Sequence, residues 1–385
     1  MMTSCLRTLR RAAPLLFASW VTAAPPDFVY LDYGAKTQTR QAYREGAAAV
    51  WDHVHAALRE ADAALTAPIT SVMDKTGLAA SGDRHDYFTI APYFWPDPTK
   101  ADGLPFIRHD GKVNPMARDQ ATDYLARAAF FTHFPLLVEG YFYTGNSHYR
   151  DRALLWLDTW FVDPATRMNP NLNYAQGVPG VSDGRCFGII EWTGIGNLIT
   201  AIQLLQAEDA LPAALASGIQ QWFREYAHWF QFSELAQEEG TRLNNHGTWY
   251  DVQLVGLLLF AGLPDQARTV LESVKSQRIA TQIEPDGSQP HEIARTKSLS
   301  YSTMNLKGFV QLATFGARHG VDLWGYETTD GRSIPRALAF LEPYYTGREK
   351  WPHPQLGDLE DAERSLMAFA TASQSQFGPL RSTHP

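Results

Sequence analysis

Residues 124–144 read YLARAAFFTHFPLLVEGYFYT, and this stretch decides the fold class. Its apolar side chains, from Tyr124 through Phe131 to Leu137, recur about every 3.6 residues, as they do on one face of an α-helix. Few segments of the chain alternate polar and apolar residues with a period of two, which argues against a large sheet. We therefore predict an all-α protein.

Similar patterns predict further helices along the chain, at about 40–66, 116–144, 147–161, 189–207, 211–238, 247–261, 264–281, 301–318, 334–343 and 359–375. Two long loops, at about 70–115 and 163–188, interrupt them, and ordered loops of this length are usually functional. Helices in antiparallel pairs predict an incomplete (α/α) toroid, with a cleft between its inner helices and long substrate-binding loops. The rival arrangement, a solenoid of short repeats, is not favoured because no fixed repeat period is found.

The first 23 residues have the pattern of a secretory signal peptide. Three arginines precede an apolar run at 12–21, and small residues follow at 21–23. The apolar run is too short to span a bilayer. We expect cleavage near residue 23, a periplasmic or secreted mature protein, and a single toroid domain over residues 24–385.

The chain is acidic, with 33 Lys and Arg against 41 Asp and Glu and a net charge of −8 at pH 7. Loss of the signal peptide would change this charge to −11 and remove Cys5, so that Cys186 would remain alone and no intrachain disulfide could form. The acidity argues against nonspecific binding to nucleic acid or to an anionic membrane. We expect a monomer that binds an anionic polysaccharide through basic groups gathered in one cleft.

The segment that points most clearly to chemistry is RLNNHGTWY at 242–250, where two amides and an imidazole precede an apolar helix. Asn244 or Asn245 in this position is also a good helix N-cap, so a purely structural role is an alternative. A second polar segment, HEIARTKSLSY at 291–301, again precedes an apolar helix. If the two segments face each other, they form a pocket lined by Asn, His, Arg and Tyr side chains.

Such a pocket suits β-elimination from a 4-linked uronic acid. Removal of the C5 proton builds negative charge on the neighbouring carboxylate, which amide and imidazole donors stabilise. An arginine close to a phenol favours its ionised form. The phenolate can then take the C5 proton and return it to the departing O4, so that one residue is both base and acid.

These residues also carry a family resemblance. Asn244-Asn245-His246 with Trp249, Arg295 and Tyr301 resembles the alginate lyase domain family of polysaccharide lyases. The loop DYFTIAPYFWPDP at 86–98, with GKVNP at 111–115, is similar to the glucuronan lyase-like subgroup, polysaccharide lyase family thirty-eight.

The resemblance implies an (α/α) toroid and a β-elimination that needs no metal and no cofactor. It implies that Asn245 and His246 neutralise the substrate carboxylate, that Arg295 supports the site, and that Tyr301 is base and acid. The mannuronate-cleaving relatives of family five carry Ser-Tyr-Trp after the histidine, whereas this chain has Gly-Thr-Trp at 247–249. Glucuronan and mannuronate-type alginate are both expected substrates.

Around these four catalytic candidates we expect a set of substrate-binding residues from both segments and from the loops: Arg242, Asn244, Trp249, Tyr250, His291, Lys297, Arg185 and Trp95.

Two other functions remain open. An inverting glycoside hydrolase on a similar toroid would need two separated carboxyl groups, for which the candidates are Asp251, Glu284, Glu292 and Glu191. A noncatalytic carbohydrate-binding periplasmic protein would use the same aromatic and basic groups without turnover. A metal site is not expected, because His53 and His55, two residues apart on a helix, do not share a face.

Overall fold

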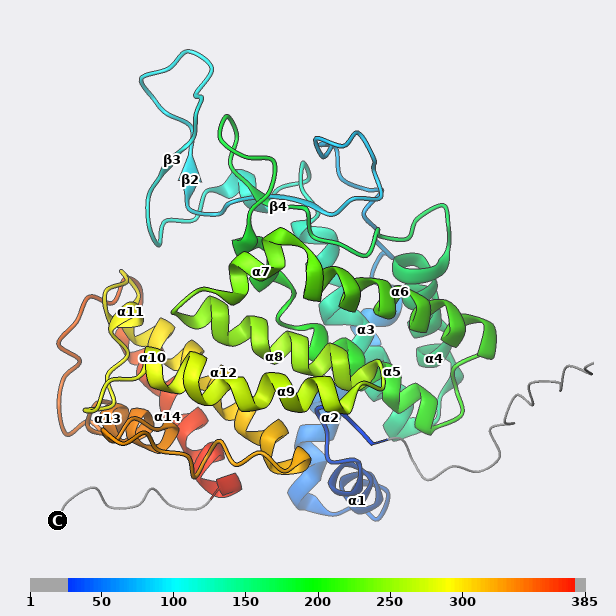
Figure 1. Cartoon of the computed structure of the whole chain (residues 1–385). Helices are drawn as coiled ribbons and strands as arrows, with labels where there is room; N and C mark the ends of the chain where they lie inside the picture. Colours follow the sequence, from blue (N-terminus) through cyan, green and yellow to red (C-terminus); the bar gives the residue numbers. More distant parts are fainter. Residues whose placement is uncertain (1–26, 378–385) are drawn as a thin grey trace, which may run out of the picture.

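The structure, a computed structural model, describes residues 27–377 and confirms the all-α prediction (Figure 1). The predicted signal peptide at residues 1–23 lies outside the described residues. The α-helices of the described chain are α1 (Tyr33–Arg44), α2 (Ala48–Thr66), α3 (Tyr124–Thr144), α4 (Ser147–Leu157), α5 (Ile195–Ala207), α6 (Ala213–Phe232), α7 (Glu234–Gly240), α8 (Asn245–Phe260), α9 (Pro264–Val274), α10 (Ala280–Gln282), α11 (Pro290–Ile293), α12 (Ser298–His319), α13 (Ile334–Tyr345) and α14 (Leu359–Phe377).

Successive helices pack against one another around one hydrophobic core. Helix α3 contacts α2, α4 and α5, while α8 contacts α7, α9 and α12. The core runs from Phe28 to Ala370 and includes the fully buried indoles of Trp156, Trp160 and Trp192. Helix α8 is buried along most of its length, as expected for an inner helix of a toroid.

Several predicted helices are interrupted, each for a local reason. The helix predicted at 40–66 is divided between α1 and α2, because Gly46 adopts a left-handed φ of 77° that ends the first of them. The helix predicted at 211–238 is divided at Ser233, whose side chain accepts a hydrogen bond from the backbone of Ala236 and caps α7. The helix predicted from 116 begins at Tyr124, after a short 3-10 turn at Pro115–Arg118.

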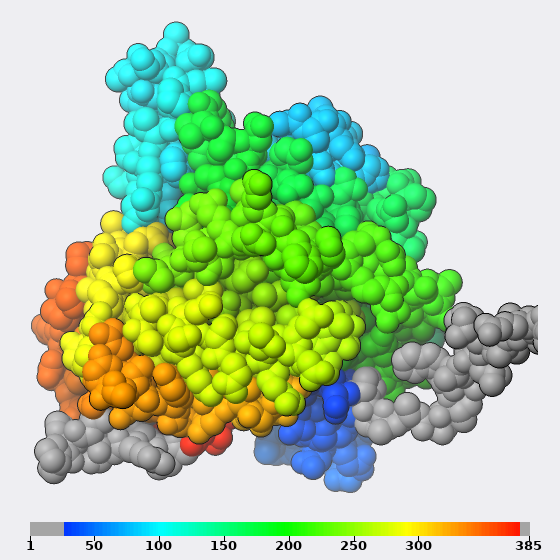
Figure 2. All heavy atoms as spheres, in the orientation of Figure 1, coloured from blue at the N-terminus to red at the C-terminus, as the bar shows by residue number. Residues whose placement is uncertain are grey.

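The two long loops contain four short strands and lie together at one end of the helices. Strand β1 (Phe88–Ile90) pairs in parallel with β4 (Tyr174–Gly177), which joins the two loops. Strand β2 (Phe94–Trp95) pairs antiparallel with β3 (Ile107–Arg108), and this hairpin projects beyond the helices (Figures 1 and 2).

Buried polar contacts fix the first loop to the helices. Lys75 and Asp123 form an ion pair of 3.1 Å between fully buried side chains. Asp123 also accepts a hydrogen bond from the backbone of Phe88, which places β1. Glu191, in the 3-10 helix η3 (Cys186–Trp192), accepts hydrogen bonds from the Tyr87 and Thr89 hydroxyls on the same loop.

No single helix between residues 27 and 377 has the length and apolar character needed to cross a bilayer, although η3 and α5 pass that test as a bent pair.

Candidate active site

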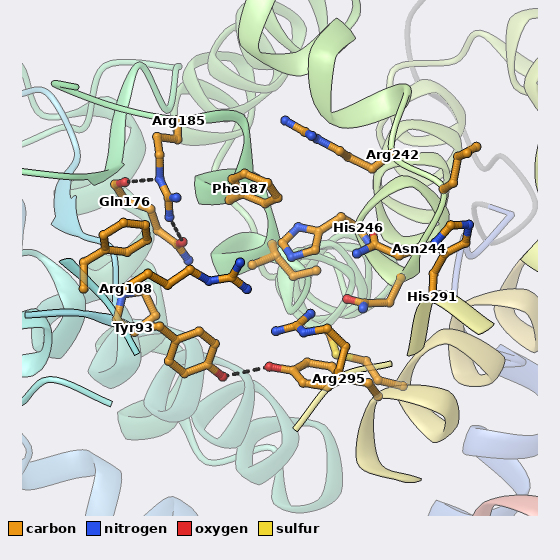
Figure 3. Close-up of a pocket in the computed structure, with 17 residues that line it drawn as sticks. Tyr93, Arg108, Gln176, Arg185, Phe187, Arg242, Asn244, His246, His291 and Arg295 are labelled. Atoms are coloured by element: carbon orange, nitrogen blue, oxygen red, sulfur yellow. Dashed lines mark hydrogen bonds between the residues drawn. The ribbon is translucent and has the colours of Figure 1, made fainter. Parts of the chain in front are cut away.

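A cleft of about 550 Å³ lies where the long loops meet α8, α11 and α12 (Figure 3). Residues of the two segments singled out in the sequence both line it, and the segments meet where Asn245 contacts Glu292. Eight of the predicted site residues line the cleft: Tyr301, His246, Asn245, Arg295, Arg242, Asn244, His291 and Arg185. No described aspartate or glutamate is among the lining residues, so the cleft is basic although the chain is acidic.

The other four predicted site residues do not line the cleft. Trp249 and Tyr250 lie on α8, and their side chains pack against other helices outside the cleft. The Trp249 indole donates to the Met304 carbonyl at 3.0 Å. The Tyr250 hydroxyl likewise donates to the Phe230 carbonyl at 3.1 Å.

Lys297 and Trp95 contact neighbouring backbone segments outside the cleft. Lys297 is the N-cap residue of α12, and its backbone forms a bridge with Gln355. The Trp95 indole donates to the Lys112 carbonyl at 3.0 Å and so braces the β2–β3 hairpin.

Sequence reasoning did not include several lining residues that the loops supply, namely Tyr93, Arg108, Gln176 and Phe187. Arg108 is at the end of β3 and points into the cleft in Figure 3. The neighbouring aromatic residues Phe94 and Trp95 in the motif at 86–98 were a signal for Tyr93. Phe187, two residues from Arg185, had no signal of its own.

Tyr301 lies in the first turn of α12 between Tyr93 and Arg295. Its hydroxyl is 2.8 Å from that of Tyr93, and the Arg295 guanidinium lies 4.1 Å from the centre of its ring. Burial and the contact with Tyr93 raise the pKa of Tyr301, and the charge of Arg295 opposes this only in part. The expectation that Arg295 would leave the phenol partly ionised is therefore wrong for the resting site, because desolvation outweighs the arginine.

The two neighbouring asparagines have different roles. The Asn244 side chain accepts a hydrogen bond from the backbone of His246 at 3.3 Å and caps α8, so the structural alternative applies to this residue. Asn245 is buried, and its side-chain amide donates to both carboxylate oxygens of Glu292, at 2.8 and 3.0 Å. Glu292 thereby fixes the orientation of the Asn245 amide.

His246 is oriented by a second buried carboxylate. Its Nδ1 lies 2.5 Å from an oxygen of Glu239, a fully buried residue of α7. Because an ionised carboxylate only accepts hydrogen bonds, Nδ1 carries a hydrogen, and Nε2 is left for the cleft, where it can donate to an anion once it also carries a hydrogen. The edge of the imidazole packs against Phe187, with the ring centres 4.9 Å apart.

Asp110, on the loop after β3, connects two arginines of the cleft. It pairs with Arg295 at 3.1 Å and with Arg108 at 2.6 Å. Burial raises the pKa of Asp110, but hydrogen bonds and charge from Arg295 and Arg108 lower it to about 2. The carboxylate is therefore ionised at neutral pH and holds Arg295 beside Tyr301.

None of the four candidate carboxyl groups for the hydrolase alternative lines the cleft. Asp251 forms a buried ion pair with Arg278, and Glu284 pairs with Arg332. Glu292 is buried and bonded to Asn245, and the half-buried Glu191 accepts hydrogen bonds from the first loop. The site therefore lacks the pair of carboxyl groups that a hydrolase places on either side of the scissile bond.

Comparison with known proteins agrees with this geometry. The sequence profile of the alginate lyase family matches residues 71–351. The chain belongs to the alginate lyase family. It is thus a polysaccharide lyase, and its fold is the (α/α) toroid of that family, as predicted.

Solved structures of other lyases resemble this one. An alginate lyase from Bacteroides ovatus superimposes with a TM-score of 0.86 and 34% identity, over 93% of this chain and 96% of that chain. Alginate lyase A1-III from Sphingomonas species A1 is more distant, with a TM-score of 0.46 and 19% identity over 76% of this chain and 77% of that chain. A search of curated proteins found no match to this lyase.

Proposed function

We propose that this lyase cleaves a β-1,4-linked uronic acid polymer, glucuronan or mannuronate-type alginate, by metal-independent β-elimination. The main support for the proposal is the position of Tyr301. It lines the cleft together with His246, Asn245 and Arg295, and no described aspartate or glutamate lines the same cleft. Three of these groups can face a substrate carboxylate, while the phenol supplies the proton transfer. The subgroup of glucuronan lyase-like enzymes fits the loop motif at 86–98.

The positive groups of the cleft stabilise the charge that develops during the reaction. As the C5–H bond breaks, negative charge moves onto the substrate carboxylate, where His246 and Arg295 lie in the same cleft. An amide nitrogen carries two hydrogens. Glu292 orients the Asn245 amide, and we assign one of its hydrogens to the substrate carboxylate.

Tyr301 then transfers the proton. As a phenolate it takes the C5 proton, the double bond forms between C4 and C5, and the bond from C4 to O4 breaks. The new phenol gives its proton to O4, so that Tyr301 returns to the phenolate and a 4,5-unsaturated uronate end is released. Because burial and Tyr93 keep the resting Tyr301 neutral, this cycle requires that Tyr301 first lose its own proton.

We also propose that the lyase is exported, on the signal-like pattern of residues 1–23. Mass spectrometry of the protein recovered from the periplasm or medium tests this, with a new N-terminus near residue 24 as the expected result. Retention of the full N-terminus inside the cell would contradict export.

One assay tests the reaction. Purified lyase is incubated with glucuronan, polymannuronate, polyguluronate and hyaluronan, with and without EDTA, while the ultraviolet absorbance of the unsaturated product and the new reducing ends are recorded. We expect absorbance and reducing ends to rise together with glucuronan or polymannuronate, and EDTA to have no effect. Reducing ends without absorbance would indicate hydrolysis, binding without either would indicate a carrier, and inhibition by EDTA would contradict the metal-free reaction.

A further inference from the structure

Arg185 differs from the other arginines of the cleft in its charge balance. Arg108 and Arg295 share Asp110, and Arg242 forms an ion pair with Glu238. Within residues 27–377, Arg185 has no carboxylate at ion-pair distance. Arg185 is therefore an arginine of the cleft that forms no ion pair with a described acidic side chain.

The Arg185 guanidinium is nevertheless held in one position. Its Nε donates to the Gln176 carbonyl at 2.9 Å and its Nη2 to the Gln176 side chain at 3.3 Å (Figure 3). The rings of Phe94 and Phe187 lie 4.8 and 4.9 Å from the guanidinium carbon. Contacts of this kind orient an arginine before a ligand arrives and lower the entropy cost of binding.

Gln176 itself has an uncommon backbone conformation. Its φ is 50°, in the left-handed region that side chains other than glycine seldom adopt. Its backbone N–H donates to the Thr89 hydroxyl at 2.8 Å, and that hydroxyl donates to the half-buried Glu191 at 2.9 Å. Strained residues held by their surroundings are concentrated at functional sites. Here the strained residue is the one that orients Arg185.

The electrostatics favour an anionic ligand. Burial lowers the pKa of Arg185, and the nearby charges of Arg108 and Arg242 lower it further. A half-buried cation without a neutralising partner is costly. Nη1 makes no hydrogen bond to a described residue, so the guanidinium retains donors for a planar, bidentate acceptor such as a carboxylate.

We propose that Arg185 binds the carboxylate of a second uronic acid residue, next to the one that loses its C5 proton, so that cleavage requires consecutive uronates. The face of Phe187 contacts Arg185 and its ring also packs against His246, so Phe187 separates this second carboxylate position from the reacting one. The inference rests on the proposed function and makes it more specific. A polymer in which every second sugar is neutral lacks the second carboxylate.

The test uses Arg185→Gln and a matched control, Arg40→Gln. Arg40 also stacks on an aromatic ring, that of Phe142 at 4.1 Å, and is paired with Glu208, but it is not among the residues that line the cleft. Binding of a uronate tetrasaccharide is measured by calorimetry in a Tyr301→Phe background, and turnover is measured in the otherwise unaltered enzyme.

We expect Arg185→Gln to weaken binding and raise KM about 10- to 100-fold, the usual worth of a charge-assisted hydrogen-bonded pair, with kcat within about threefold. Arg185→Lys should recover part of the loss, and Arg40→Gln should change neither quantity. Hyaluronan should be a poor substrate for the unaltered enzyme.

Unchanged binding and KM in a folded Arg185→Gln variant, or equal cleavage of hyaluronan and polyuronate by the unaltered enzyme, would overturn the inference. Failure of the proposed function gives a different result, since the unaltered enzyme would then release no unsaturated product from any uronan.

Discussion

The hydroxyl oxygens of Tyr93 and Tyr301 lie 2.8 Å apart, so the proposed base is held by a second phenol that the first long loop supplies. Tyr301 belongs to helix α12, whereas Tyr93 lies on the loop between β1 and β2. The site is therefore complete only when the first long loop is packed over the helices.

Activity should depend on pH through Tyr301. Because burial raises its pKa above the ordinary value of a phenol, little phenolate is present at neutral pH. We expect kcat/KM to rise by about tenfold per pH unit above neutrality, until the phenol is ionised.

The same shift acts on stability. A raised pKa means that the neutral phenol stabilises the fold below about pH 10 and that this contribution is lost as pH rises further. Circular dichroism at each pH separates unfolding from catalysis, and a kcat/KM that is flat or falls between about pH 7 and 9 in a folded enzyme would contradict the assignment.

Tyr93→Phe should remove one hydrogen bond from Tyr301 and leave the ring in place. A net hydrogen bond contributes roughly 0.5–1.5 kcal/mol, and the contact with Tyr93 raises the pKa of Tyr301, so we expect its loss to increase kcat/KM near neutral pH about 2- to 10-fold with little change in melting temperature. A kcat/KM equal to that of the unaltered enzyme would show that Tyr93 does not hold Tyr301 in its neutral form.

Glu239→Gln should impair catalysis through His246. Glutamine lacks the negative charge that balances an imidazolium, the form of His246 that can donate from Nε2 to a substrate carboxylate while Nδ1–H is held, so we expect kcat to fall at least about tenfold. Glu234→Gln, an exposed position on the same helix, is the matched control and should have no effect. Equal rates for the two variants would show that Glu239 does not contribute to catalysis through His246.

The two asparagines should respond differently to alanine. Asn244→Ala removes a helix cap and should cost about 1 kcal/mol of stability. Asn245→Ala removes the side-chain donor of the buried Glu292 and keeps only the backbone donor of residue 245, so we expect a loss of roughly 1–3 kcal/mol together with most of the activity. Unfolding by urea and initial rates measure both effects, and full activity in a folded Asn245→Ala variant would exclude it from the site.

Much of the fold was predictable because helical periodicity is a local property. The helix predicted at 116–144 forms α3 from Tyr124 to Thr144, and the two polar segments lead into the first turns of α8 and α12. The side-chain directions of Trp249 and Tyr250 could not be predicted. Successive helical residues point in different directions, and the sequence does not show which side of α8 faces the cleft.

The supporting residues were also beyond sequence reasoning, because they depend on contacts between distant elements. Arg108 reaches the cleft through the pairing of β2 with β3, and Asp110 meets Arg295 from a loop 185 residues away. The raised pKa of Tyr301 likewise follows from burial, which the Arg–Tyr spacing does not reveal.

The central claim is that Tyr301 transfers the proton, and Tyr301→Phe tests it most directly. The measurement is the initial rate of formation of the unsaturated product, together with calorimetric binding of a uronate tetrasaccharide to the same preparation. Our account predicts that turnover falls to below about one per cent, since general acid–base catalysis is lost, while the dissociation constant stays within about threefold. Turnover close to that of the unaltered enzyme would contradict the account.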